Sequence, residues 1–102
     1  MDRQIETIKL DVSHASSTLS LHEMLAAAFQ FPSYYGRNWD AFWDCIRDPN
    51  QSRMPKHIVI VGMDLLEKKL PEASAKLRNI LSESQVENPS EFIVTYEERE
   101  LP

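Results

Sequence analysis

Apolar residues recur along the chain with two different spacings, and these spacings predict alternating strands and helices. Ile8, Leu10 and Val12 alternate with polar residues, which is the pattern of a half-buried strand. The continuous β-branched run at residues 58–61 is typical of a fully buried central strand in a parallel sheet. The apolar run at residues 92–96 predicts a third strand.

Four segments between these strands carry apolar residues at helical spacing. The first helix is predicted over residues 21–30, with Ser20 at the start of a capping-box pattern. The second begins at Asn38, whose side chain can cap its first free amides. A short third helix is expected after the capping residue Asp64, and Pro71 should end it and open the fourth. The buried face of that fourth helix is predicted to comprise Ala73, Leu77, Ile80 and Leu81.

The order β-α-α-β-α-α-β implies helical crossovers, because a tight hairpin cannot join parallel strands. We therefore expect an α/β fold with a small three-stranded parallel sheet, right-handed connections and about four helices. A single domain is expected over residues 1–102, with residues 97–102 as a frayed, charged tail. Polar, proline-containing stretches predict a loop at residues 48–55 and a turn at residues 88–90.

Composition narrows the classes of function. The net charge of −5 argues against a nucleic-acid binder, which needs a basic face, and favours a basic protein partner. The single cysteine, Cys45, cannot form an internal disulfide, and the three histidines lack the spacing of a zinc site, so no metal or other cofactor is expected. His22 is expected to lie at the surface or to cap a partner. Without an apolar signal region or a membrane-length apolar run, the chain is predicted to be cytoplasmic.

The most informative stretch is residues 31–45, which holds both tryptophans. Pro32 and Gly36 exclude a helix from its first half, and Gly36 permits a positive φ there. In its second half, helical spacing gives a buried face of Phe42, Cys45 and Ile46 and an outer face of Asp40, Trp43 and Asp44. An aromatic residue beside fixed charges on a rigid helix predicts a protein-binding surface. A solvated helix face with Trp43 in the core fits the same spacing.

The stretch Phe-Pro-Ser-Tyr-Tyr-Gly-Arg-Asn-Trp-Asp-Ala-Phe-Trp-Asp-Cys resembles the barstar signature. That signature is a tyrosine pair, Gly, one residue, Asn, then Asp-Ala-x-Trp-Asp-Cys, and about eight identities at fixed spacing make the resemblance specific. Barstar-like proteins are intracellular inhibitors that plug the active site of a ribonuclease such as barnase, and their fold is a small parallel sheet packed by helices. The resemblance therefore implies an inhibitor that is not an enzyme, is a monomer when free, and binds a basic ribonuclease.

The resemblance also implies which residues contact that partner, namely Tyr34, Tyr35, Gly36, Asn38, Trp39, Asp40, Trp43 and Asp44. Asp44 matches the dominant anchor of the family. Carboxylates on a rigid helix can replace phosphates among the Arg, Lys and His cations of a ribonuclease active site. The family also uses an acid from its last helix, for which Glu83 is one candidate, while Ser82 is an equally good match.

The chain departs from the family pattern at Arg47, in the loop that follows it, and in having no match for the second cysteine of the family. Arg47 brings a positive charge to the binding side, close enough to Asp44 to pair with it, and is expected to disfavour barnase itself. The loop at residues 48–54 is longer than in the family pattern and lacks its aromatic residue.

Two other functions fit the same residues. Asp40 and Asp44 could act as a general acid and base, but this needs a cleft with shifted pKa values, and adjacent turns of an exposed helix are expected to form a ridge. The surface could instead bind a toxin domain that is not a ribonuclease, as an immunity or adaptor protein does. Inhibition of a ribonuclease is the function that we expect.

Overall fold

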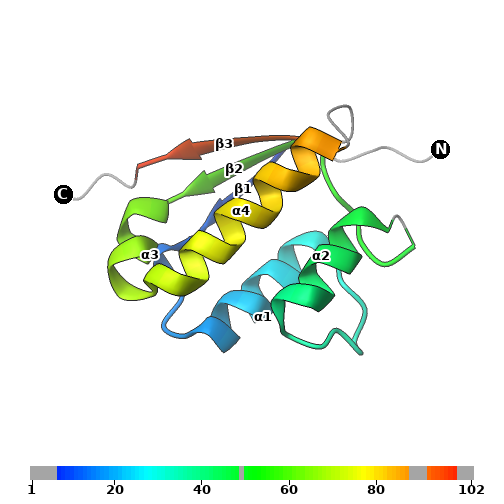
Figure 1. Ribbon diagram of the computed structural model, residues 1–102, viewed down its shortest axis with the longest axis horizontal. Helices are drawn as coiled ribbons and strands as arrows, with labels where there is room; N and C mark the ends of the chain where they lie inside the picture. The colour runs from blue at the N-terminus through cyan, green and yellow to red at the C-terminus, as the bar shows by residue number, and fades with distance from the viewer. Residues whose placement is uncertain (1–6, 49, 88–91, 99–102) are drawn as a thin grey trace.

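A computed structural model describes residues 7–48, 50–87 and 92–98 (Figure 1). The strands are Thr7–Asp11 (β1), His57–Val61 (β2) and Ile93–Glu97 (β3), and they form a parallel sheet in the order β1-β2-β3. The helices are Thr18–Phe29 (α1), Trp39–Arg47 (α2), Met63–Lys69 (α3) and Pro71–Glu87 (α4), with a 3₁₀ turn at Val12–His14 (η1). The predicted α/β fold and the order of its elements are confirmed. The turn predicted at residues 88–90 and most of the predicted tail lie outside the described residues.

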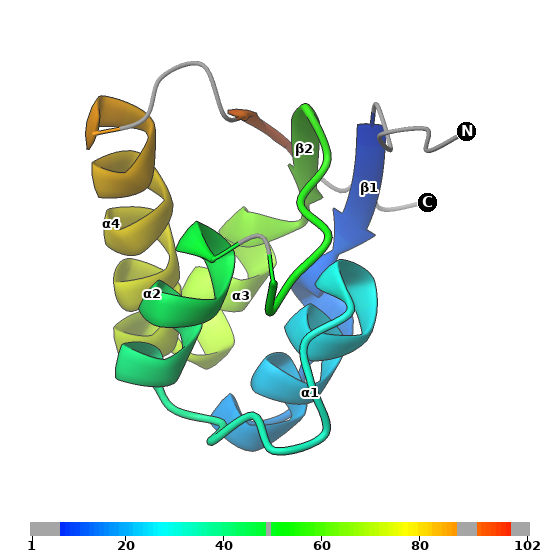
Figure 2. The ribbon, with the colours of Figure 1, turned by 90° about the vertical axis from the view of Figure 1, so that its right-hand side faces the viewer.

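The helices gather on one side of the sheet (Figures 1 and 2). On that side the parallel register places Ile58 of the central strand between Ile8 and Val94, and Ile60 beside Leu10. These residues belong to or pack against one hydrophobic core. Burying their side chains stabilises the fold by roughly 25 cal/mol per Å² of apolar surface. Because this gain favours apolar residues on the covered side of each strand, their pattern in the sequence predicts the sheet.

The start of α1 was predicted too late. α1 begins at Thr18, because its N-cap is Ser17 and Ser20 is the third helical residue. The hydroxyl of Ser17 accepts a hydrogen bond from the Ser20 amide at 3.0 Å, and the hydroxyl of Ser20 accepts one from the Ser17 amide at 3.0 Å. This reciprocal pair satisfies two amides that a helix start otherwise leaves without partners.

The cap predicted for α3 is also wrong. Gly62 is the N-cap with a φ of 79°, and Asp64 lies within the first turn. A Cβ atom at position 62 would lie 2.8 Å from the Cβ of Ser13, so both the backbone conformation and the close approach to η1 require glycine. Val12, predicted in the first strand, lies in η1, and Glu97, predicted in the tail, ends β3. Two predicted helix boundaries are confirmed: Asn38 caps α2, and Pro71 opens α4 after α3 has ended at Lys69.

The candidate partner-binding site

α2 has the two faces that its sequence predicts. The buried face comprises Phe42, Cys45 and Ile46. The outer face carries Asp40 and Asp44, both exposed, and the half-buried Trp43. Burial, with the negative charges of Asp44 and Asp48, raises the pKa of the Cys45 thiol, so this cysteine stays protonated at neutral pH and is a poor nucleophile.

The loop that leads into α2 is fixed by the capping residue Asn38. Its Oδ1 accepts a hydrogen bond from the Ala41 amide at 2.8 Å, and its Nδ2 donates to the carbonyl of Gly36 at 3.2 Å. A Cβ at position 36 would lie 3.0 Å from that Nδ2, so the approach is tight. The positive φ expected near Gly36 occurs one residue later, at Arg37, with a φ of 51°. Gly36 therefore provides space for the cap.

A buried aromatic pair holds the same loop from inside. Tyr35 is 5% exposed and His22 is 1% exposed, so the expectation of a surface histidine is wrong. The Tyr35 hydroxyl lies 2.6 Å from Nδ1 of His22 and 3.5 Å from the carbonyl oxygen of Asn38. Burial lowers the pKa of His22 and raises the pKa of Tyr35, so both side chains are uncharged at neutral pH. The pair ties α1 to the loop.

His22 also supports the first tryptophan of α2. The ring centroids of His22 and Trp39 are 4.3 Å apart, and Trp39 meets Phe42 edge to face at 5.6 Å. Trp39 is thus fixed on one side by the core and half-buried overall. Its orientation depends on α1 as well as on α2.

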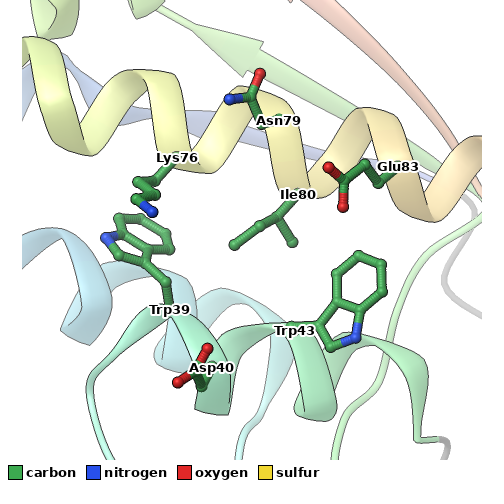
Figure 3. A pocket seen from close by; sticks show the side chains of 7 residues that line it. All are labelled: Trp39, Asp40, Trp43, Lys76, Asn79, Ile80 and Glu83. Atoms are coloured by element: carbon green, nitrogen blue, oxygen red, sulfur yellow. The ribbon is translucent and has the colours of Figure 1, made fainter.

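A pocket of about 300 Å³ lies between α2 and α4 (Figure 3). It is lined by Trp39, Asp40 and Trp43 from α2 and by Lys76, Asn79, Ile80 and Glu83 from α4. Ile80 points into the space between the two indoles, with Lys76 on the side of Trp39 and Glu83 on the side of Trp43. The ridge expected for the outer face of α2 is therefore one wall of a concave surface.

Three carboxylates at this surface have no partner among the described residues. Asp40, Asp44 and Glu83 make no hydrogen bond or ion pair with any part of the chain that the structure describes. Other acids are paired; for example, Glu67 lies 2.6 Å from Arg78. Uncompensated carboxylates from two helices can therefore bind cations that approach from outside.

Residues 5–97 match the family described as Barstar (barnase inhibitor). The chain belongs to the barstar family. It is also 31% identical over 77 residues to the protein named "Putative ribonuclease inhibitor YrdF" of Bacillus subtilis (strain 168), an alignment that covers 76% of this chain and 82% of the relative. The resemblance seen at residues 31–45 is thus confirmed.

The barstar signature falls into two groups of residues in this structure. Tyr34, at 74% exposed, and the outer face of α2 lie at the surface. Tyr35 lies inside, so its side chain offers little area to a partner and acts on the loop instead. Glu83 lines the pocket and Ser82 does not, which favours Glu83 as the acid from the last helix.

Arg47 and the loop that follows it, which depart from the barstar pattern, come directly at the end of α2. The guanidinium carbon of Arg47 lies over the Trp43 ring, 4.4 Å from its centroid. In the following loop, the Asp48 carboxylate accepts hydrogen bonds from the Gln51 side chain at 2.7 Å and the Asn50 amide at 2.9 Å, and both lower the pKa of Asp48. The amide of Arg53 donates to the last residue of α1 at 2.7 Å. The loop is therefore anchored at both ends.

Sequence reasoning missed the wall that α4 contributes. Lys76, Ile80 and Glu83 recur at the i, i+4, i+7 spacing of one helix face, so the pattern was visible in the sequence. It could not be assigned to the site without knowing that this face packs beside α2.

In the described ranges, no helix is long and apolar enough to cross a membrane, and no group of three His, Cys, Asp or Glu side chains is placed to hold a metal.

Proposed function

We propose that this barstar-family protein inhibits a ribonuclease by covering the active site of the enzyme with α2, the loop before it and the facing side of α4. The family description and the name of the Bacillus relative support a ribonuclease as the partner. The observation that carries the proposal is the group of three unpaired carboxylates, Asp40, Asp44 and Glu83, on and beside one pocket.

The chemistry follows from what a ribonuclease active site must do. The enzyme stabilises the negative charge of a phosphodiester, so it holds Arg, Lys and His side chains in fixed positions. Carboxylates presented by rigid helices replace the phosphate oxygens, and an arginine can bind one of them through two parallel hydrogen bonds. Asp44 is the central anchor, while Asp40 and Glu83 bind cations at the pocket. None of the three acts as a proton-transfer group.

The aromatic residues supply the apolar part of the interface. Tyr34, Trp39 and Trp43 offer large, rigid side chains around the acids, the kind of residue that contributes most to protein–protein affinity. Gly36 and Asn38 shape the loop that enters the active site. Tyr35 keeps that loop in position. The inhibitor acts as a monomer in the cytoplasm, where it protects the cell from the ribonuclease.

The test is a comparison of two variants in a ribonuclease inhibition assay. Asp44→Ala should abolish most inhibition while the thermal melt stays unchanged, because an exposed, unpaired carboxylate contributes little to folding. The control is Glu98→Gln, which removes an exposed acid that follows β3 and does not line the pocket, and it should inhibit normally. Two enzymes serve in the assay. One is barnase, and the other is the product of the neighbouring gene if it is a ribonuclease and a pull-down shows that it binds this protein. Unchanged inhibition with a lowered melting temperature would show that Asp44 is structural.

A further inference from the structure

Lys76 brings a positive charge into the pocket between α2 and α4, among the acids of the proposed site. It is exposed, and it lines the pocket on the side of Trp39 (Figure 3). No hydrogen bond or ion pair joins it to another residue within residues 7–48, 50–87 and 92–98. Its charge is therefore available to whatever enters this part of the pocket.

The pocket is acidic at the end of Glu83, whereas its other end holds Lys76 from α4 together with Asp40 from α2. Glu83 lies two turns after Lys76 on the same helix face, a separation of about 10 Å at 1.5 Å per residue. Ion pairs need about 4 Å between nitrogen and oxygen, so Glu83 does not neutralise Lys76.

This division affects what a partner can place in the pocket. A cation that enters beside Trp43 meets Glu83, whereas a cation that enters beside Trp39 meets Lys76 as well as Asp40, so Lys76 offsets the attraction of that acid. Bringing like charges together at an interface from which water is excluded is unfavourable, and this repulsion is a common source of specificity. An acidic group at the same place would gain an ion pair.

We propose that Lys76 is a specificity-determining residue, which selects ribonucleases with an acidic side chain facing the Trp39 end of the pocket and disfavours those with a cation there. This inference rests on the proposed function. It means that α4 contributes to the choice of partner independently of α2.

The probe is barnase, and the measured quantity is its inhibition constant with three variants. Lys76→Glu should inhibit barnase more strongly than the wild type by about tenfold or more, and Lys76→Met should fall between them. The matched control is Lys68→Glu on α3, an exposed lysine that gives the same change in net charge. α3 lies on the side of α4 where Arg78 pairs with Glu67, about 200° around the helix from Lys76.

A second arm supplies the acidic group. A panel of barnase variants, each with one Arg or Lys beside the active site changed to Glu, is titrated against the wild type and Lys76→Glu. At least one panel member should bind the wild type more tightly and Lys76→Glu more weakly than barnase does, which is the coupling expected of a direct charge pair.

Several results would overturn the inference. Equal inhibition by Lys76→Glu and Lys68→Glu would assign the effect to net charge, and the absence of coupling across the panel would exclude a direct pair. If neither the wild type nor Lys76→Glu inhibits barnase, Lys76 is not what excludes this enzyme. The proposed function stands or falls separately, on loss of inhibition by Asp44→Ala with the ribonuclease from the pull-down.

Discussion

His22 shows how a single buried residue can fix a binding loop from behind. The ring contacts Tyr35 and Trp39, and its Nδ1 is hydrogen-bonded to the Tyr35 hydroxyl. Its Nε2 is buried and has no hydrogen-bond partner among the described residues. A second proton on this ring would place a charge away from water, and this loss of solvation on burial is the physical cause of the lowered pKa of His22.

This burial predicts a loss of stability in mild acid. The unfolded chain takes up a proton near pH 6.5, whereas the folded chain does so only at lower pH, so His22 favours unfolding as the pH falls below about 6.5. We expect the free energy of unfolding to fall between pH 7 and pH 5.5 and to fall less steeply in His22→Gln. That variant should also lose about 1 kcal/mol at pH 7.5 through the altered buried hydrogen bond. Denaturant titrations across this pH range measure both effects.

His57→Gln is the control for this experiment. His57 lies in β2, where its ring is hydrogen-bonded to Thr95 at 2.9 Å. Replacing His57 removes one histidine and leaves His22 unchanged. Because His22 is unchanged, this variant should keep the loss of stability in mild acid that His22 causes. If His22→Gln also keeps that loss, the ring does not oppose protonation in the folded protein.

At the scale of single elements, glycine matters in two different ways. Gly62 has a positive φ, and an added Cβ would meet a Cβ of η1 at 2.8 Å. Gly36 has no such φ, and its added Cβ would meet the end of the Asn38 side chain at 3.0 Å, which can move. We expect Gly62→Ala to cost about 2 kcal/mol or more and Gly36→Ala to cost clearly less. Thermal melts of the two variants rank the costs, and equal losses would contradict this account.

Local sequence patterns predicted the helices and strands of this fold well, but they predicted the contacts between them poorly. The faces of α2 and the opening of α4 follow from spacing and from Asn38 and Pro71, because those signals act within one turn of a helix. The start of α1 was missed because serines 17 and 20 both suit a cap, and only the backbone geometry decides between them. The burial of His22 and the choice of Glu83 depend on how separate helices pack, which one-dimensional spacing does not contain.

The stacking of Arg47 on Trp43 sharpens the expectation that this residue affects partner choice. Arg47→Met removes the charge but keeps an apolar chain over the indole, whereas Arg47→Thr removes both. If the charge disfavours barnase, both variants should inhibit barnase more strongly and the cognate ribonuclease more weakly. If covering the indole matters, only Arg47→Thr should lose stability, by about 0.5–1 kcal/mol. Inhibition constants and thermal melts separate the two effects.

Unchanged inhibition constants in both Arg47 variants would indicate that another segment determines specificity. If neither Arg47 variant changes an inhibition constant by more than a few tenths of a kcal/mol, Arg47 is a solvated residue, as many exposed charges are. Specificity on the α2 side would then lie in the loop at residues 48–54, and exchanging that loop with the one of a relative is the next measurement.

For the molecule as a whole, the two sides of the sheet differ in character. Helices cover only one side (Figure 2), although Val59 on the other side is only 6% exposed. There Lys9 of β1 and Glu97 of β3 form an ion pair of 3.3 Å across the central strand. Such long side chains shield an apolar neighbour with their methylene groups, so β2 is buried on both faces without a second layer of helices. The acids of the proposed binding site, which have no partner among the described residues, belong to α2 and α4 and so lie on the helical side.

This distribution of charge predicts fast association that depends on salt. The chain has a net charge of −5, and Asp40, Asp44 and Glu83, which have no partner among the described residues, concentrate negative charge on the proposed binding surface. A basic ribonuclease is therefore attracted in the correct orientation before contact. Raising the ionic strength from 0.1 M to 1 M shortens the Debye length from about 10 Å to about 3 Å, so the association rate should fall steeply while the dissociation rate changes little. Stopped-flow mixing with barnase or with the captured ribonuclease measures both rates.

Two variants of equal net charge test whether the position of the charge matters. Asp40→Asn removes an acid from the pocket, and Glu98→Gln removes an exposed acid at the end of β3. If the field is concentrated at the binding surface, Asp40→Asn should slow association at low salt by several times more than Glu98→Gln, and the difference should shrink at 1 M salt, where the Debye length is about 3 Å. Equal slowing would mean that only net charge attracts the partner. Rates that stay flat across the salt range would instead point to an interface held mainly by Tyr34, Trp39 and Trp43.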